Sequence, residues 1–188
     1  MNSNTKKLAV TAILLAICIA SQFFKNLSVY ITGPIVNLCL ILAVMAAGLM
    51  WGIILAIITP VTAFIIAAAP VMTAVPGIIP LIMIGNAVLV IVVNFLFKPA
   101  VNADKGIINF KSVLSALLAC TAKGCFMGLT IALWLLPTYI PAESPLRNKM
   151  EIFQTTFSLV QFVTALIGFV YFCIVWIPLK KAIKTEQI

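Results

Sequence analysis

Six long apolar stretches, separated by short polar links, constrain the fold of this chain more than any other feature of its sequence. A helix needs about 20 consecutive apolar residues to cross the hydrocarbon core of a bilayer. The composition agrees, since 64% of the 188 residues are hydrophobic and only 9% are charged. We therefore predict one all-α domain over residues 1–188, an integral membrane bundle whose six transmembrane helices span about 6–24, 33–48, 51–68, 78–97, 111–136 and 152–177.

Prolines and glycines indicate where these helices end or bend. Gly33-Pro34 is expected to open the second helix, Pro60 to kink the third, and Pro178 to end the sixth. A very short link at 49–52 joins the second helix to the third. The segment 69–80 (APVMTAVPGIIP) holds three prolines and a glycine, which predicts a loop.

The basic residues divide unevenly between the two sides of the predicted bundle. Six spans place both termini on one side, and the positive-inside rule then predicts cytoplasmic termini in a multi-pass protein of the cell membrane. Loops 25–32, 69–80 and 137–151 are expected outside. The first side holds eight lysines and the second side only three basic residues: Lys6, Lys7, Lys98, Lys105, Lys111, Lys180, Lys181 and Lys184, against Lys25, Arg147 and Lys149.

Several classes of function lack the residues that they need. The net charge of +8 fits cytoplasmic loops, and no run of like charges indicates nucleic-acid binding. The chain has no histidine, no phosphate-binding G-x-x-x-x-G-K-[ST] motif and no paired carboxylates, so we predict that it is not an enzyme. We predict no cofactor and no metal, and we interpret five cysteines as buried packing residues: Cys18, Cys39, Cys120, Cys125 and Cys173.

Lys123 lies near the middle of the fifth apolar stretch. At 1.5 Å of rise per residue it is about 18 Å from Lys111 at the basic end, close to the bilayer midplane. A charge at that depth costs at least about 2.5–3.5 kcal/mol. The sequence therefore predicts that Lys123 faces a polar cavity, the alternatives being hydrogen bonds to carbonyls or a side chain that reaches out through lipid.

A stripe at helical spacing runs outward from this lysine. Cys120, Lys123, Met127, Thr130 and Trp134 are separated by steps of three and four, which place them on one helix face. We expect the face to form a wall that leads inward from the outside. Ordinary packing, with Trp134 at the membrane interface, is the alternative.

Further polar residues lie in the fourth, sixth and second apolar stretches. Gln154, Ser158 and Gln161 share one face of the sixth helix, and Asn86 lies in the fourth. Amides in hydrocarbon are costly unless paired, so we expect a shared polar cavity, with helix–helix hydrogen bonding as the alternative. Asn37 either contacts a ligand or caps its own helix.

No acidic residue of the apolar stretches neutralises Lys123, because the four acids lie in links or the tail: Asp104, Glu143, Glu151 and Glu186. The simplest partner is an anion brought by the ligand, such as a carboxylate or a phosphate. An uncharged Lys123 is the competing possibility.

The first apolar stretch carries Ala12, Ala16 and Ala20, a small residue at every fourth position. Such a ridge allows another helix to approach closely. The ridge either packs inside this chain or docks a separate subunit.

Together with its length and six helices, this ridge resembles the substrate-binding S component of energy-coupling factor (ECF) transporters. Gly33-Pro34-Ile35-Val36-Asn37, the link into Trp51-Gly52, and Leu81-Ile82-Met83-Ile84-Gly85-Asn86 are similar to segments of that family. The resemblance implies capture of a vitamin or related micronutrient from outside, in a cavity built from helices four to six and closed by outer loops. It also implies that the alanine ridge docks a membrane T component, with two cytoplasmic ATPases supplying the energy.

Carried onto this chain, the resemblance makes Asn86, Lys123, Gln154 and Gln161 the substrate contacts. A stand-alone carrier or channel, or a membrane scaffold, is the alternative.

Overall fold

The computed structural model describes residues 3–24, 28–103 and 108–185, and within these ranges the chain is helical and has no strand. Six helical segments are long and apolar enough to cross a membrane, which confirms the predicted all-α class with six spans. These segments are Asn4–Gln22, Val29–Ala46, Leu49–Ala67, Ile78–Asn102, Phe110–Tyr139 and Pro145–Leu179.

The first three spans are single helices, α1 (Ser3–Gln22), α2 (Val29–Ala46) and α3 (Leu49–Ala67). Helix α2 begins before the predicted Gly33-Pro34, because the Ser28 side chain caps it by accepting a hydrogen bond from the Tyr30 backbone N–H at 3.1 Å. The link to α3 is also shorter than predicted. Gly48, with a φ of 102°, makes the turn, and α3 starts at the next residue.

The predicted loop 69–80 holds a short helix, α4 (Pro70–Ala74). The prediction overlooked that proline is well suited to the first position of a helix, where its missing N–H would have no partner. Gly77, with a φ of 92°, then precedes α5 (Ile78–Val92).

The fourth and fifth spans each contain a π-helix. Helix α5 continues through η1 (Val93–Phe97) into α6 (Lys98–Ala103). Helix α7 (Phe110–Met127) continues through η2 (Gly128–Leu135) into α8 (Leu136–Tyr139). A π-helix replaces i→i+4 hydrogen bonds by i→i+5 bonds, so the faces that residues occupy change along the span.

The last span is also interrupted. It comprises a 3-10 helix, η3 (Pro145–Lys149), then α9 (Met150–Phe157) and α10 (Leu159–Thr185), with a break at Ser158. The prediction that Pro178 ends this helix was wrong, because α10 continues through it to Thr185. Pro178 removes one backbone hydrogen bond at an exposed position, which bends or weakens a helix without ending it.

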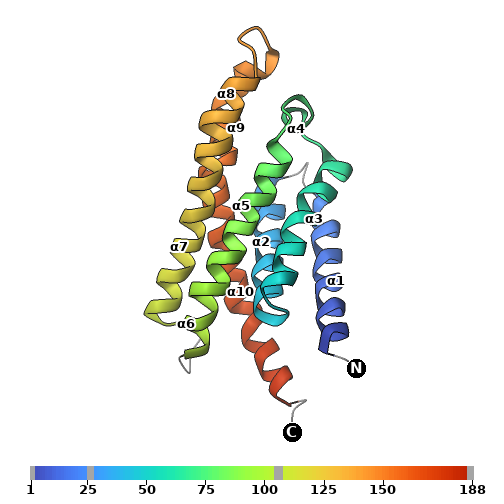
Figure 1. Cartoon of the computed structure of the whole chain (residues 1–188), viewed down its shortest axis with the longest axis vertical. Helices are drawn as coiled ribbons and strands as arrows, with labels where there is room; N and C mark the ends of the chain where they lie inside the picture. The colour runs from blue at the N-terminus through green and yellow to red at the C-terminus, as the bar shows by residue number, and fades with distance from the viewer. Residues whose placement is uncertain (1–2, 25–27, 104–107, 186–188) are drawn as a thin grey trace.

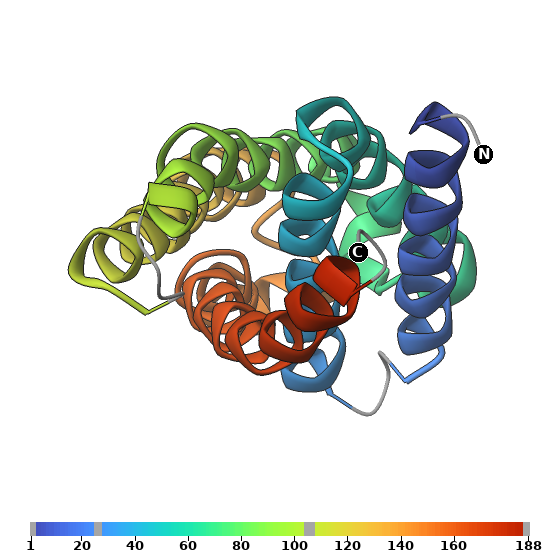
Figure 2. The ribbon, with the colours of Figure 1, turned by 90° about the horizontal axis from the view of Figure 1, so that it is seen from below.

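The helices form a closed bundle with both termini at one end (Figure 1). Helix α2 is the most buried span and contacts α1, α3, α5 and α10. The view from below shows α1 at the edge of the bundle (Figure 2). The links opposite the termini, with α4, α8 and η3, form what we call the loop end.

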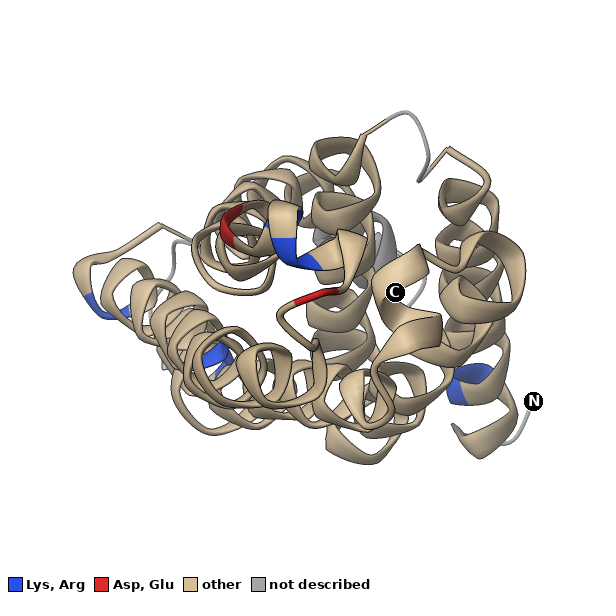
Figure 3. Cartoon of the chain, turned by 90° about the horizontal axis from the view of Figure 1, so that it is seen from above, with Lys and Arg blue, Asp and Glu red and all other residues tan. Residues whose placement is uncertain are grey.

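Charged residues differ between the two ends. At the loop end, the described charges are Glu143, Arg147, Lys149 and Glu151, which cancel, and Figure 3 shows both colours there. At the terminal end, the Lys98 ammonium donates a hydrogen bond to the carbonyl of Val44 in the last turn of α2 at 3.0 Å. Four of the charged residues named in the sequence analysis lie outside the residues that the structure describes: Lys25, Asp104, Lys105 and Glu186.

Candidate functional site

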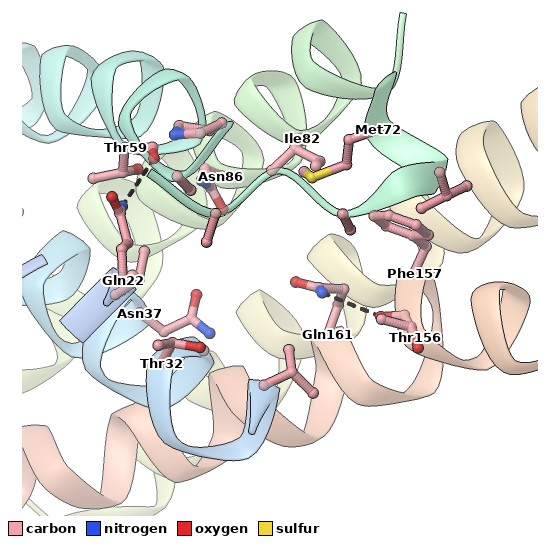
Figure 4. A pocket seen from close by; sticks show the side chains of 18 of the residues that line it. Gln22, Thr32, Asn37, Thr59, Met72, Ile82, Asn86, Thr156, Phe157 and Gln161 are labelled. Carbon is pink, nitrogen blue, oxygen red and sulfur yellow. Dashed lines mark hydrogen bonds between the residues drawn. The ribbon is translucent and has the colours of Figure 1, made fainter. Parts of the chain in front are cut away.

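A cavity of about 340 Å³ lies between the helices (Figure 4). Its lining includes the end of α1, the start of α2 and α4, which places it in the half of the bundle nearer the loop end. Cavities of this size hold small organic ligands. Its walls come from all six spans and from α4, rather than from helices four to six alone. Eight polar residues line it: Gln22, Thr32, Asn37, Thr59, Asn86, Lys123, Thr156 and Gln161.

Lys123 forms the centre of one polar cluster in this cavity. Its side chain is 2% exposed, and its ammonium donates to Oδ1 of Asn37 at 2.7 Å and to Oδ1 of Asn86 at 2.8 Å. The Asn37 amide in turn donates to the hydroxyl of Thr164 at 3.4 Å. Helices α2, α5, α7 and α10 therefore meet at this cluster.

Two glycines bring these helices close enough for the contacts to form. A Cβ at Gly85 would lie 2.6 Å from Cγ of Met127, so α5 approaches α7 one residue away from Asn86. A Cβ at Gly168 would lie 2.8 Å from Cβ of Asn37, so α10 approaches α2 equally closely. The close neighbour of Gly85 is therefore helix α7.

The cluster leaves the charge of a protonated Lys123 without a counter-ion. Its hydrogen-bonding partners are amides, which are dipoles and carry no net charge. The acids that the structure describes, Glu143 and Glu151, are exposed residues at the loop end. A protonated lysine has three N–H donors, and only two of them are engaged among the described residues, whereas both donors of an uncharged amine would be satisfied. An anion in the cavity would supply both the missing charge and the missing acceptor.

A second polar pair lines the cavity from α1 and α3. The Gln22 amide donates to the carbonyl of Thr59 at 3.0 Å, and both side chains are 2% exposed. Oε1 of Gln22 and Oγ1 of Thr59 are buried atoms without a hydrogen-bond partner among the described residues. Figure 4 shows this pair on one side of the cavity and Gln161 with Thr156 on the other.

The sequence did not predict a role for this pair. Gln22 ends α1, where a polar residue is ordinary, and Thr59 precedes Pro60, where a threonine hydroxyl can bond a freed backbone carbonyl. That helical role falls to Thr62, whose hydroxyl donates to the Thr59 carbonyl at 3.0 Å. Only the packing of α1 against α3 reveals that both side chains face the cavity.

Four of the eight predicted site residues share the cavity, namely Lys123, Asn86, Asn37 and Gln161. Asn37 was expected either to bind a ligand or to cap its helix, and Ser28 takes the capping role. The side chain of Gln161 donates to the carbonyl of Thr156 at 3.2 Å, which holds it at the cavity wall.

Gln154 and Ser158 lie in a different place. They line a groove of about 560 Å³ between η2 and the α9–α10 junction, together with Gly124, Gly128 and Cys125. The break at Ser158, with φ −120° and ψ −88°, turns α9 relative to α10. Gln154 and Gln161 therefore do not share a face, and Gln154 donates to the carbonyl of Ala132 at 3.1 Å instead.

Of the five residues of the predicted stripe, only Lys123 lines the cavity. Cys120 and Met127 are buried in the apolar core, and Thr130 and Trp134 lie outside the cavity. The π-helix η2 begins at Gly128 and changes the face that the following residues occupy. Trp134 is 60% exposed, while Ile131 and Leu135 are buried in its place. The Thr130 hydroxyl donates to the carbonyl of Phe126 at 2.7 Å within its own span.

The alanine ridge faces away from the bundle, because Ala12, Ala16 and Ala20 are all exposed. Packing of the ridge inside this chain is thereby excluded. Among the cysteines, Cys18, Cys39 and Cys120 are buried as predicted, while Cys173 is only half-buried and Cys125 is exposed in the groove.

Comparisons of the chain with protein-family models, with curated proteins and with solved structures found no match. The fold and the cavity therefore stand on the sequence and the structure of this chain.

Proposed function

We propose that this chain is the substrate-capture (S) subunit of an ECF-type ABC importer. It binds a small anionic vitamin or related micronutrient from the outside and delivers it with a membrane T component and two cytoplasmic ATPases. The observation that carries the proposal is the cavity beside Lys123, where a buried amine has two amide partners and room for an anion.

The position of the cavity supports uptake from outside. It lies toward the loop end, and the basic residues Lys6, Lys7, Lys98 and Lys111 lie toward the other end. By the positive-inside rule, the loop end is the outer end. A ligand from outside therefore has the shorter path to Lys123.

The exposed ridge on α1 supports an external partner. Small residues allow close helix contact in a bilayer, where apolar burial alone gives little attraction between helices. Ala12, Ala16 and Ala20 present such a surface on a helix at the edge of the bundle. The resemblance to ECF S components assigns that surface to the T component.

Ligand capture by Lys123 is tested with the full chain in lipid nanodiscs. Small molecules that co-purify with the protein are identified by mass spectrometry and titrated by calorimetry. We expect an organic anion whose binding is abolished by Lys123→Met. Lys111→Met, at the exposed start of the same helix, is the matched control and keeps the affinity. Equal affinities of the Lys123→Met variant and the unmodified chain would remove Lys123 from the site.

The alternatives give different results in the same preparation. A stand-alone carrier or channel would move the identified anion across liposomes that contain only this chain. A scaffold would retain no small molecule at all. The open cavity beside Lys123 counts against the scaffold, because a purely structural bundle has no need of buried vacant space.

A further inference from the structure

Gln22 and Thr59 are buried polar residues that the lysine cluster does not use. Buried polar atoms almost always have hydrogen-bond partners, and one without a partner calls for an explanation. Here two such atoms, Oε1 of Gln22 and Oγ1 of Thr59, belong to residues that line the same cavity and are joined by the hydrogen bond from the Gln22 amide to the backbone carbonyl of Thr59. Two unpartnered atoms on residues that line one vacant cavity indicate a missing partner.

We propose that Gln22 and Thr59 form a second recognition subsite, which binds a hydroxyl or N–H donor of the ligand while Lys123 binds its anionic group. The subsite rests on the proposed function, because it deepens the specificity of the same cavity. It also assigns ligand contacts to α1 and α3, which the resemblance to S components does not include.

The chemistry of the two atoms decides what they recognise. The amide N–H of Gln22 is already engaged by the Thr59 carbonyl, so its Oε1 is left to accept a hydrogen bond. A carbonyl oxygen accepts only from a donor, which excludes a second carboxylate at this position. The Thr59 hydroxyl both donates and accepts, and it therefore suits a ligand hydroxyl or amide.

Apolar residues of the cavity are available to the rest of the ligand. Val36, Pro60, Ala63 and Ile82 line the cavity and offer apolar contacts. The cavity therefore fits a compact organic anion that also carries apolar surface and an uncharged donor group. An anion without that donor would leave Oε1 of Gln22 unsatisfied, and buried unpaired groups are how sites discriminate between close analogues.

The proposal predicts opposite effects of one substitution on stability and on binding. Thr59→Val keeps the shape of the side chain and removes an orphaned hydroxyl, so the thermal midpoint of the ligand-free protein should stay the same or rise. The affinity for the ligand should fall about tenfold. A residue with a purely structural role would not show this combination.

The experiment uses the full chain in nanodiscs with the low-mass fraction of yeast extract as the probe. Native mass spectrometry identifies the retained anion, and calorimetry then compares Thr59→Val and Gln22→Met with the unmodified chain. The matched control is Thr11→Val, a buried threonine of α1 whose hydroxyl bonds the Lys7 carbonyl within its own helix. We expect the control to keep the affinity.

Three outcomes separate the two proposals. Weaker binding of a donor-bearing anion by both variants, with an unchanged control, supports the subsite. Retention of an anion that needs Lys123 but is bound equally well by Thr59→Val and Gln22→Met overturns the subsite and leaves the proposed function standing. Retention of no anion by the unmodified chain overturns both. If Gln22→Met misfolds, the affinity and the thermal midpoint of Thr59→Val still test whether the subsite exists.

Discussion

The ammonium of Lys123 lies 2.8 Å from Oδ1 of Asn86, although the two residues are 37 positions apart in the chain and belong to different helices. The contact holds the lysine in the interior of the bundle and turns it away from lipid. The partner of the ammonium in this contact is an amide, which carries no net charge, whereas a carboxylate would have neutralised the ammonium. The cluster is therefore held in place by hydrogen bonds that leave the charge of a protonated Lys123 uncompensated.

A change of Asn86 to aspartate tests this interpretation. Asn86→Asp keeps the size of the side chain and places a carboxylate beside the ammonium, so an internal ion pair should replace the ligand anion. We expect at least about a tenfold loss of anion affinity, measured by calorimetry, with the fold retained. Asn102→Asp, an exposed position of the same span, is the control. Undiminished anion binding by Asn86→Asp would show that the anion does not neutralise Lys123.

A second prediction concerns the close approach of α5 and α7. Gly85→Ala would place a Cβ 2.6 Å from Cγ of Met127, so the Met127 side chain or one of the two helices must shift. Overpacking of this kind costs about 1–3 kcal/mol. We expect a lower thermal midpoint and, because Asn86 is adjacent, weaker ligand binding. Val88→Ile adds similar volume at a partly exposed position of α5 and should be close to neutral. A Gly85→Ala protein with unchanged midpoint and affinity would contradict the requirement for close approach.

A third prediction concerns the alanine ridge. Ala16→Leu adds volume to an exposed surface of α1, so it should leave the ligand affinity unchanged and block assembly with the T component. Co-purification with that subunit measures assembly, and calorimetry measures ligand binding. Ile17→Leu, an exposed neighbour with conserved volume, serves as the control. If Ala16→Leu still assembles, the ridge contacts lipid only.

The sequence alone determined the class of the fold and the need of Lys123 for polar surroundings. The free energy of placing an apolar run of transmembrane length in the bilayer is large for each segment by itself, so the helices can be predicted without tertiary information. The free energy of burying a charge near the bilayer midplane is also large, so Lys123 needs a polar partner. Asn86, Asn37 and Gln161 line one cavity with Lys123, because polar side chains in apolar stretches are costly unless they are paired, and their role as substrate contacts stays a prediction.

The tertiary structure alone decided which polar residues do not join that group. Thr130 and Trp134 do not line the cavity, because η2 changes the helical period after Met127. Gln154 and Ser158 do not line it either, because the helix is interrupted at Ser158. Both changes depend on which of two backbone hydrogen-bonding patterns a short segment adopts. The free energies of these patterns differ little, and the spacing of residues in the sequence does not reveal which one forms. Only the tertiary structure placed Gln22 and Thr59 in the cavity, because the hydrogen bond between them depends on how α1 packs against α3.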